Sequence, residues 1–321
     1  MPLDALAALE LRLGRSGQAP VDLSIRLDRS TARRLPAAAL PSHLTRFACG
    51  GRRGAWRGVR WLWLEYDLDG APGAGGGLPL PSAAADLAPE APDPLASGLF
   101  AALAGRRIPA SHRRALERAL RALPRGARTR YAFSMLSRPG RPERIEIGGL
   151  SFDAVRRLVE RLAGADAGRA VGELRPLTAD AEPHHLALDV GEEVRPRFGV
   201  NCSFRRLPRR EPRWRTLLDG LVAAGLCRPE ERDALSDWTG AETLWSACPR
   251  WPDGAGLGDA VARALSHVKL IAVPGRAPEA KAYLMVQLLR SSARSTFGRA
   301  GCRDDPARFT LPRSVGAGGP P

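Results

Sequence analysis

The chain has 321 residues, 44% of them apolar, which is enough to build a sizeable core without disulfide bonds. No run of about eighteen apolar residues occurs, and the first residues lack a basic segment followed by an apolar one, so we expect neither a transmembrane helix nor a secretory signal. The net charge is +15, yet 47 of the 49 basic residues are arginines spread along the whole chain, as the codons of a GC-rich genome produce. This spread disfavours a nucleic-acid-binding patch, which would gather its charge on one face.

Five cysteines are present, an odd number, and no two are separated by two residues. This spacing predicts neither a zinc site nor a disulfide framework, and it favours buried thiols in a reducing cytoplasm. Strand alternation places Cys202 on the face opposite Arg197 and Arg205, which argues against a nucleophilic role for this thiol.

The N-terminal part predicts a short amphipathic helix over 3–14, followed by strands over 21–27 and 57–68. Residues 71–94 are rich in Pro, Gly and Ala, so we expect a flexible surface loop that is dispensable for folding. Helical pattern returns over 94–123, with a break near Pro109 and a candidate N-cap at Ser111.

The rest of the chain repeats pairs of strands separated by helices. Strands are expected over 129–137, 143–149, 184–190, 195–205, 266–273 and 280–289. Helices are expected after Ser151, from Pro212, over 229–237 and over 258–265, with a loop over 240–257 and a flexible tail over 304–321.

The order helix, strand, strand, helix predicts an α+β protein with one antiparallel sheet. We count four strand pairs and expect a single αββα-type domain over 1–303. The sheet is predicted to be a closed or nearly closed barrel with helices on the outside, because closure removes exposed edges. An open α+β sheet with helices on one face is the alternative.

Each predicted strand has one apolar and one polar face. Leu62 and Leu64 alternate with Trp61, Trp63 and Glu65. The polar face also carries acids on the early strand and bases on the later ones. Tryptophans are poor choices for open solvent, so this face favours a barrel with a polar, wet interior, while a half-solvated sheet remains the alternative.

Familiar catalytic motifs are absent. The sequence has no GxxxxGK[ST] loop, no GxSxG elbow and no HExxH pair. His184 and His185 are adjacent on a strand and point to opposite faces, so they cannot chelate one metal ion together. We therefore predict no metal site.

The scarcest residues fall on the predicted strands. The two lysines, Lys269 and Lys281, occupy the last strand pair, and the sole asparagine, Asn201, lies on the third. Alternation predicts that Lys269, Lys281, Arg197 and Tyr283 converge in one cavity, with Glu65 on its opposite wall. Two buried ammonium groups repel each other unless an anion lies between them or carboxylates offset them.

These strands resemble the barrel of the aromatic prenyltransferases known as the ABBA family. Lys281-Ala282-Tyr283 matches the Lys-x-Tyr motif that recurs there, and His267-Val268-Lys269 offers a second inward lysine. Arg197, in RPRFGV, resembles a basic strand position of that family, and Glu65 resembles its early-strand acid. The resemblance implies five strand pairs, one more than we count. Segments such as LEYDLDG also look like those of bacterial proteins with no assigned function.

The resemblance implies a transferase of the prenyltransferase type that acts on an aromatic small molecule or a peptide. Lys269, Lys281 and Arg197 would bind the prenyl diphosphate, with Mg²⁺ as the one cofactor that such a substrate could bring, and Asn201 is a further candidate substrate-binding residue. Trp61 and Trp63 would offer π-faces to the cation, and Glu65 and Tyr283 would be catalytic. Two alternatives stay open: a non-catalytic accessory or peptide-binding protein of a biosynthetic cluster, and a nucleic-acid binder.

Overall fold

The computed structural model describes residues 6–15, 21–28, 31–32, 40–49, 57–68, 80–138, 140–178, 181, 184–243 and 260–289. The expected tail over 304–321 and most of the expected loop over 240–257 lie outside these ranges. Within the described part of the chain, no helix is long and apolar enough to span a membrane.

Ten strands form a ring in which every neighbouring pair is antiparallel. In ring order they are β1 (Leu6–Arg12), β2 (Val21–Leu27), β3 (Val59–Tyr66), β4 (Ser82–Leu87), β5 (Arg128–Ser134), β6 (Glu143–Leu150), β7 (His184–Val190), β8 (Val194–Cys202), β10 (Ala260–Ala272) and β11 (Glu279–Leu289). The pairing of β11 with β1 closes the barrel, which rules out the open sheet. A short strand, β9 (Gly240–Thr243), extends the sheet beside the start of β10.

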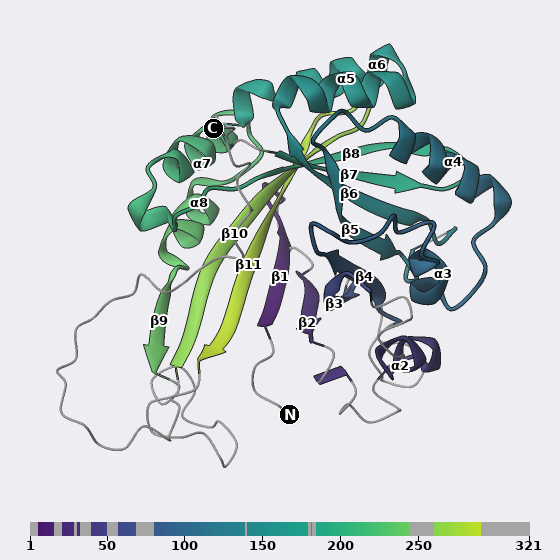
Figure 1. Ribbon diagram of the computed structural model, residues 1–321. Helices are drawn as coiled ribbons and strands as arrows, with labels where there is room; N and C mark the ends of the chain where they lie inside the picture. Colours follow the sequence, from purple (N-terminus) through teal and green to yellow (C-terminus); the bar gives the residue numbers. More distant parts are fainter. Residues whose placement is uncertain are drawn as a thin grey trace, which may run out of the picture.

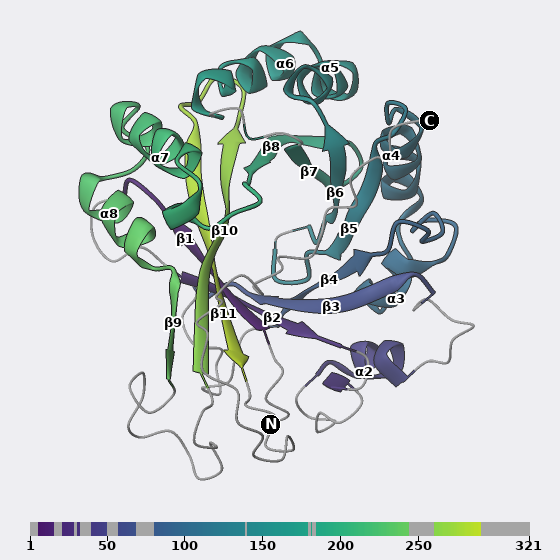
Figure 2. The ribbon, with the colours of Figure 1, turned by 60° about the vertical axis from the view of Figure 1, so that its left-hand side comes forward.

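The helices lie outside the ring, between successive strand pairs (Figures 1 and 2). They are α2 (Ser42–Cys49), α3 (Leu99–Ala104), α4 (Ala110–Arg121), α5 (Phe152–Ala163), α6 (Ala165–Gly172), α7 (Arg213–Ala223) and α8 (Pro229–Asp237). This is the helix-wrapped antiparallel barrel that the resemblance implies, and it confirms the α+β prediction.

The apolar core fills the space between the outer face of the strands and the helices. Leu62 and Leu64 of β3 and Ile145 and Ile147 of β6 are almost fully buried there. They belong to the same core as the apolar helix side chains Leu116, Val155, Leu158, Trp214 and Leu217. The opposite face of each strand, which is the polar one, therefore lines the barrel interior.

Several predicted elements are confirmed at close to their expected bounds. The strands β2, β3, β5, β6, β7 and β8, the last hairpin and the helices α5, α7 and α8 are all present. The Ser151 hydroxyl accepts a hydrogen bond from the Ala154 amide at 3.3 Å, which is the expected cap of α5. The cap of α4 differs, because that helix begins at Ala110 after Pro109, and Ser111 lies inside it.

Two segments that we expected to be helical are strands. Residues 6–12 of the predicted helix over 3–14 form β1, and the predicted helix over 258–265 falls on the start of β10. The sequence LAALELR satisfies both a helical and an alternating pattern, so local periodicity does not decide between them. Pairing decides, because β1 bonds to β2 on one side and to β11 on the other and thereby closes the barrel.

Residues 71–79 of the predicted flexible loop over 71–94 lie outside the described residues, and the prediction is wrong for residues 82–87. Residues 82–87 form β4, which is buried along its whole length between β3 and β5. Because alanine is small and only weakly apolar, this strand shows no clear alternation of apolar and polar residues in the sequence. The same small side chains allow neighbouring strands and helices to pack closely against it. With β1 and β4 added, the barrel has five strand pairs instead of the four that we counted.

We expect the Ala85→Leu substitution to destabilise the protein by about 1–3 kcal/mol, because Ala85 is fully buried and extra methylene groups must force its neighbours apart. Urea unfolding measures the change. The matched control is Ala96→Leu at an exposed turn, which should change stability by less than about 0.5 kcal/mol. Equal stability of the two variants would restore the loop interpretation of this segment.

Candidate functional site

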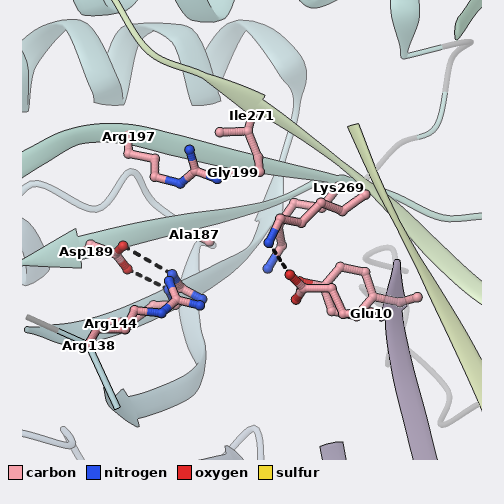
Figure 3. Close-up of a pocket in the computed structure, with 11 residues that line it drawn as sticks. Glu10, Arg138, Arg144, Ala187, Asp189, Arg197, Gly199, Lys269 and Ile271 are labelled. Carbon is pink, nitrogen blue, oxygen red and sulfur yellow. Dashed lines mark hydrogen bonds and ion pairs between the residues drawn. The ribbon is translucent and has the colours of Figure 1, made fainter. Parts of the chain in front are cut away.

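Near one end of the barrel the interior holds a cavity whose empty space, including the part open to solvent, is about 360 Å³ (Figure 3). The centre of a water-sized sphere can occupy about 30 Å³ of it, which is room for roughly two water molecules. Its lining is mostly charged and comes from strands β1, β6, β7, β8, β10 and β11 and from the segment after β5. The lining residues are Glu10, Arg138, Arg144, Ala187, Asp189, Arg197, Gly199, Lys269, Ile271, Lys281 and Tyr283.

The two lysines are brought together by the register of three strands. Lys269 of β10 lies directly opposite Lys281 of β11, and on its other side it lies opposite Asn201 of β8. A Cβ atom at Gly199 would come within 3.1 Å of the Lys269 side chain, so the glycine leaves the space that this lysine occupies. Lys269, Lys281, Arg197 and Tyr283 thus line one cavity, as the alternation of their strands predicts.

Carboxylates offset both ammonium groups. The Lys269 Nζ donates to Glu146 Oε1 at 2.8 Å, and the Lys281 Nζ donates to Glu10 Oε1. The Tyr283 hydroxyl donates to the second oxygen of Glu10. Sequence reasoning missed both acids as site residues. Glu146 was on the polar face of its predicted strand and could have been found, whereas Glu10 fell in a segment that we expected to be helical.

The arginines of the cavity are also paired. Arg144 contacts both oxygens of Asp189, at 2.5 and 3.1 Å, which Figure 3 shows on the wall opposite Glu10. Arg197 pairs with Glu279 at 3.1 Å. Arg138 lies 3.8 Å from Asp67. Each of the five cations that line the cavity therefore has a carboxylate neighbour.

These pairs control the ionisation of the buried acids. Burial acts to raise the pKa of Glu146, but the adjacent Lys269 ammonium outweighs it and lowers the pKa to about 2. In the same way, Arg144 outweighs burial at Asp189 and lowers its pKa to about 2. Burial would also raise the pKa of Glu10, and the two lysines reverse the shift to a lowered pKa. All three acids are charged at neutral pH.

Glu65 of β3 differs from the other interior acids. Burial is the main cause that raises its pKa, to about 7, and the charge of Glu10 adds to the effect while Arg144 opposes it. Its strand neighbours on the two sides are Ser24 and Ser82. No hydrogen bond or ion pair to Glu65 exists among the described residues. Such a carboxyl group changes protonation near neutral pH, as a general acid or base requires.

The predicted aromatic residues lie away from the cavity lining. Trp63 packs with Tyr131, Phe133 and Met135 inside the barrel. Trp61 lies nearer the start of β3, farther from the cavity than Trp63, and the Arg26 guanidinium carbon is 4.2 Å from its ring centroid. Tyr283 is the aromatic side chain that reaches the cavity. Its ring stacks on His267 at 4.1 Å between centroids and lies 5.0 Å from the Lys269 Nζ.

The remaining predicted site residues are close to the lining without forming it. Asn201 donates a hydrogen bond of 3.4 Å to Glu146, behind Lys269. Glu65 is coupled electrostatically to the lining residues Arg144, Glu10, Arg138 and Lys269. In the described ranges, no group of three His, Cys, Asp or Glu side chains is placed to hold a metal ion. Cys202 is buried with its pKa raised to about 12 by burial, so it offers no thiolate.

Comparison with known proteins gives similarity in structure alone. No protein-family model matches the sequence, and no curated protein matches it. Among solved structures, the 5-dimethylallyl tryptophan synthase from Streptomyces coelicolor in complex with DMASPP and Trp aligns with 17% identity and a TM-score of 0.47, over 95% of this chain and 83% of that one.

The apo form of the prenyltransferase PriB aligns with 17% identity and a TM-score of 0.49, over 87% of this chain and 79% of that one. A 6-dimethylallyl tryptophan synthase aligns with 14% identity and a TM-score of 0.45, over 88% and 80%. At this distance the likeness does not assign an activity, because one fold hosts many functions. The function must be argued from the cavity.

Proposed function

We propose that the protein is a transferase of the prenyltransferase type, with a prenyl diphosphate and an aromatic small molecule or peptide as its substrates. The observation that supports this most is the convergence of Lys269, Lys281 and Arg197 in an interior cavity beside Glu65. Cations inside a concave site favour a small anionic ligand over the external stripe that a nucleic acid would need.

In the proposed reaction, the bond between the prenyl carbon and the diphosphate oxygen breaks, and the electron pair leaves with the diphosphate. Lys269, Lys281 and Arg197 would stabilise the negative charge that develops there. A carbon of the aromatic acceptor attacks the allylic cation and then loses a proton. Glu65 would take up that proton, since a base with a pKa of about 7 is half ionised at neutral pH.

Tyr283 would face the cation with its ring, and the Lys269–Tyr283 contact of 5.0 Å already places a positive charge beside that ring. Trp61 and Trp63 do not line the cavity. They would therefore lie farther from the allylic cation than the sequence analysis predicted. The residues of the site do not form a ligand set for Mg²⁺, so any Mg²⁺ would arrive with the diphosphate.

One observation favours a second candidate function. Because every cation of the cavity already has a carboxylate neighbour, the site presents paired charges of both signs. Such a surface also suits a zwitterionic or peptide ligand that is bound without being transformed. The second candidate is therefore a non-catalytic accessory or peptide-binding protein.

Titration of wild-type protein with inorganic pyrophosphate, followed by calorimetry, tests the proposal. We expect the Lys281→Ala substitution to weaken one binding event about tenfold or more, which is about 1.4 kcal/mol. Arg276→Ala is the matched control, because Arg276 is exposed in the turn of the same hairpin. If Lys281→Ala impairs folding, Arg197→Gln replaces it as the variant whose pyrophosphate affinity is measured, because Arg197 lines the cavity and is partly exposed.

The second arm is turnover. Dimethylallyl diphosphate and a panel of aromatic acceptors, including tryptophan and tryptophan-containing peptides, are incubated with the protein and the products are weighed by mass spectrometry. A prenylated acceptor supports the transferase. Pyrophosphate binding that Lys281→Ala leaves unchanged would remove this function and leave the accessory protein.

A further inference from the structure

The end of the barrel opposite the cavity carries a second group of charged residues. Four inward arginines gather there at the end of β2, the start of β3 and the start of β5: Arg26, Arg60, Arg128 and Arg130, here called the distal arginine cluster. Asp86 at the end of β4 lies among them, and the charges of Asp28 and Glu90 also act on Arg26 and Arg128. Four arginines outnumber these three acids, so the charge of the group is positive.

Two β-bulges build the cluster. The register between β3 and β4 shifts between Val59 and Trp61, and the register between β5 and β6 shifts between Thr129 and Tyr131. A bulge inserts one extra residue and re-aims its side chain. The extra residues are Arg60 and Arg130, from the two strands that flank the strand of Asp86.

Only one of these arginines is matched by the acid. The Arg60 Nη2 and Nε groups donate to the same oxygen of Asp86, at 2.5 and 3.2 Å. Arg26 lies over the Trp61 ring, and this cation–π contact does not neutralise the positive charge of Arg26. Within the described ranges, Arg26, Arg128 and Arg130 form no ion pair with a carboxylate. This contrasts with the cavity, where every cation has such a neighbour.

Arg130 is the most unusual member. It is only 6% exposed, and its Nε group is buried with no hydrogen-bond partner. A Cβ atom at Gly148 would come within 2.7 Å of its side chain, so the glycine makes room for it on β6. An arginine keeps its charge at neutral pH, and a buried donor left without a hydrogen bond costs about 1–3 kcal/mol.

The neighbouring arginines add to this cost. Burial first, and then the positive charges of Arg130 and Arg60, lower the pKa of Arg128. Arg60 remains 27% exposed at its side chain, and Arg26 and Arg128 are also only partly buried, so a small ion in solvent can reach the cluster. Like charges held together at a solvent-accessible point are stabilised when an anion binds between them.

We propose that the distal arginine cluster is a binding site for a phosphate group of a small ligand, separate from the cavity. Guanidinium groups in several orientations suit phosphate, whose oxygens accept paired hydrogen bonds. Along β6, Gly148 beneath Arg130 lies about 13 Å from Arg144 of the cavity, at about 3.3 Å per residue. The two groups of cations thus lie on different parts of the barrel wall, and this proposal does not depend on the proposed function.

The test uses the full-length protein with inorganic pyrophosphate as the probe, in the Lys281→Ala background, where binding in the cavity is weakened. Adding Arg130→Gln should weaken the remaining binding at least tenfold. The matched control Arg121→Gln, which removes an exposed arginine from α4, should leave it unchanged. Citrate serves as an anion without phosphate and should bind at least tenfold more weakly than pyrophosphate.

A stability measurement gives an independent reading. Without phosphate, Arg130→Gln should unfold at a higher temperature than the wild type, because it removes an unpaired buried charge. Pyrophosphate should raise the melting temperature of the wild type more than that of the variant. Arg128→Gln, at the partly exposed rim, replaces Arg130→Gln if that variant does not fold.

The outcomes separate the two sites. Loss of binding in Arg130→Gln with no effect of Lys281→Ala supports the distal site and contradicts the proposed function. Loss in Lys281→Ala alone, with Arg130→Gln equal to Arg121→Gln, overturns the distal site. Equal affinity for citrate and pyrophosphate overturns its assignment to phosphate.

Discussion

The Lys269→Ala substitution is expected to destabilise the protein by about 3–5 kcal/mol. The Lys269–Glu146 pair is 2.8 Å long, and both side chains are less than 10% exposed. Removing the ammonium leaves Glu146 buried as an unpaired charge, which is the costly outcome. Urea unfolding at pH 7 measures the loss. The double variant Lys269→Met, Glu146→Gln should recover most of it, because both charges are then absent.

The acid dependence of stability gives a second reading of the same pair. The pKa of Glu146 is about 2 in the folded protein, below its ordinary value of 4.5. A lowered pKa contributes stability above pH 4.5, and this contribution is lost as the pH falls from 4.5 towards 2. The variant Lys269→Ala should lack this loss on acidification.

The matched control is the pair Arg197–Glu279, whose side chains are 37% and 41% exposed. Arg197→Ala should cost no more than about 1 kcal/mol, because solvent screens an exposed pair. Equal costs for Lys269→Ala and Arg197→Ala would contradict a buried, functional charge network in the barrel.

Glu65→Gln is expected to reduce prenyl transfer by about 10²–10⁴-fold and, at the same time, to make the protein more stable above pH 7. In the wild type, transfer should increase as the pH rises through about 7, because only ionised Glu65 accepts the proton. The initial rate of product formation between pH 5 and 9 measures this dependence.

The stability effect has a definite sign. The folded pKa of Glu65, about 7, is above its ordinary value of 4.5. The protonated acid therefore favours the folded state, and that contribution is present below pH 4.5 and lost as the pH rises through 7. Glutamine resembles the protonated form, so at pH 8 the variant should gain about 3 kcal/mol, at about 1.4 kcal/mol per pKa unit.

Glu90→Gln is the matched control, since Glu90 is an exposed acid near the end of β4, and it should change neither rate nor stability measurably. A stabilised Glu65→Gln variant that retains full transfer activity would exclude Glu65 as the base. A variant that is not stabilised at pH 8 would contradict the raised pKa itself. The stability measurement does not depend on the proposed reaction.

The patterns that predicted the barrel are those in which side-chain alternation is strong. The last hairpin combines branched and aromatic residues with lysines, so its period of two is clear, and it placed Lys269, Lys281 and Tyr283 on one face. Helix α5 could also be predicted from the sequence, because Ser151 marks its start and a regular stripe of apolar residues marks its buried face.

The two missed strands are short and rich in alanine and leucine. Neither LAALELR nor SAAADL has a residue whose local preference excludes the other interpretation. Each becomes a strand because both of its neighbours offer backbone partners. Since these strands supply Glu10 and Asp86, missing them also hid one partner of Lys281 and the acid of the distal arginine cluster.

The sequence alone determined which residues share a face and that the shared face is polar. Only the tertiary structure decided how those charges are balanced. Alternation along a strand does not reveal which residue of another strand stands opposite, because register between distant segments is set by ring closure and bulges. For this reason Lys269 could be placed in the interior from the sequence, while its pairing with Glu146, 123 residues away, required the folded barrel.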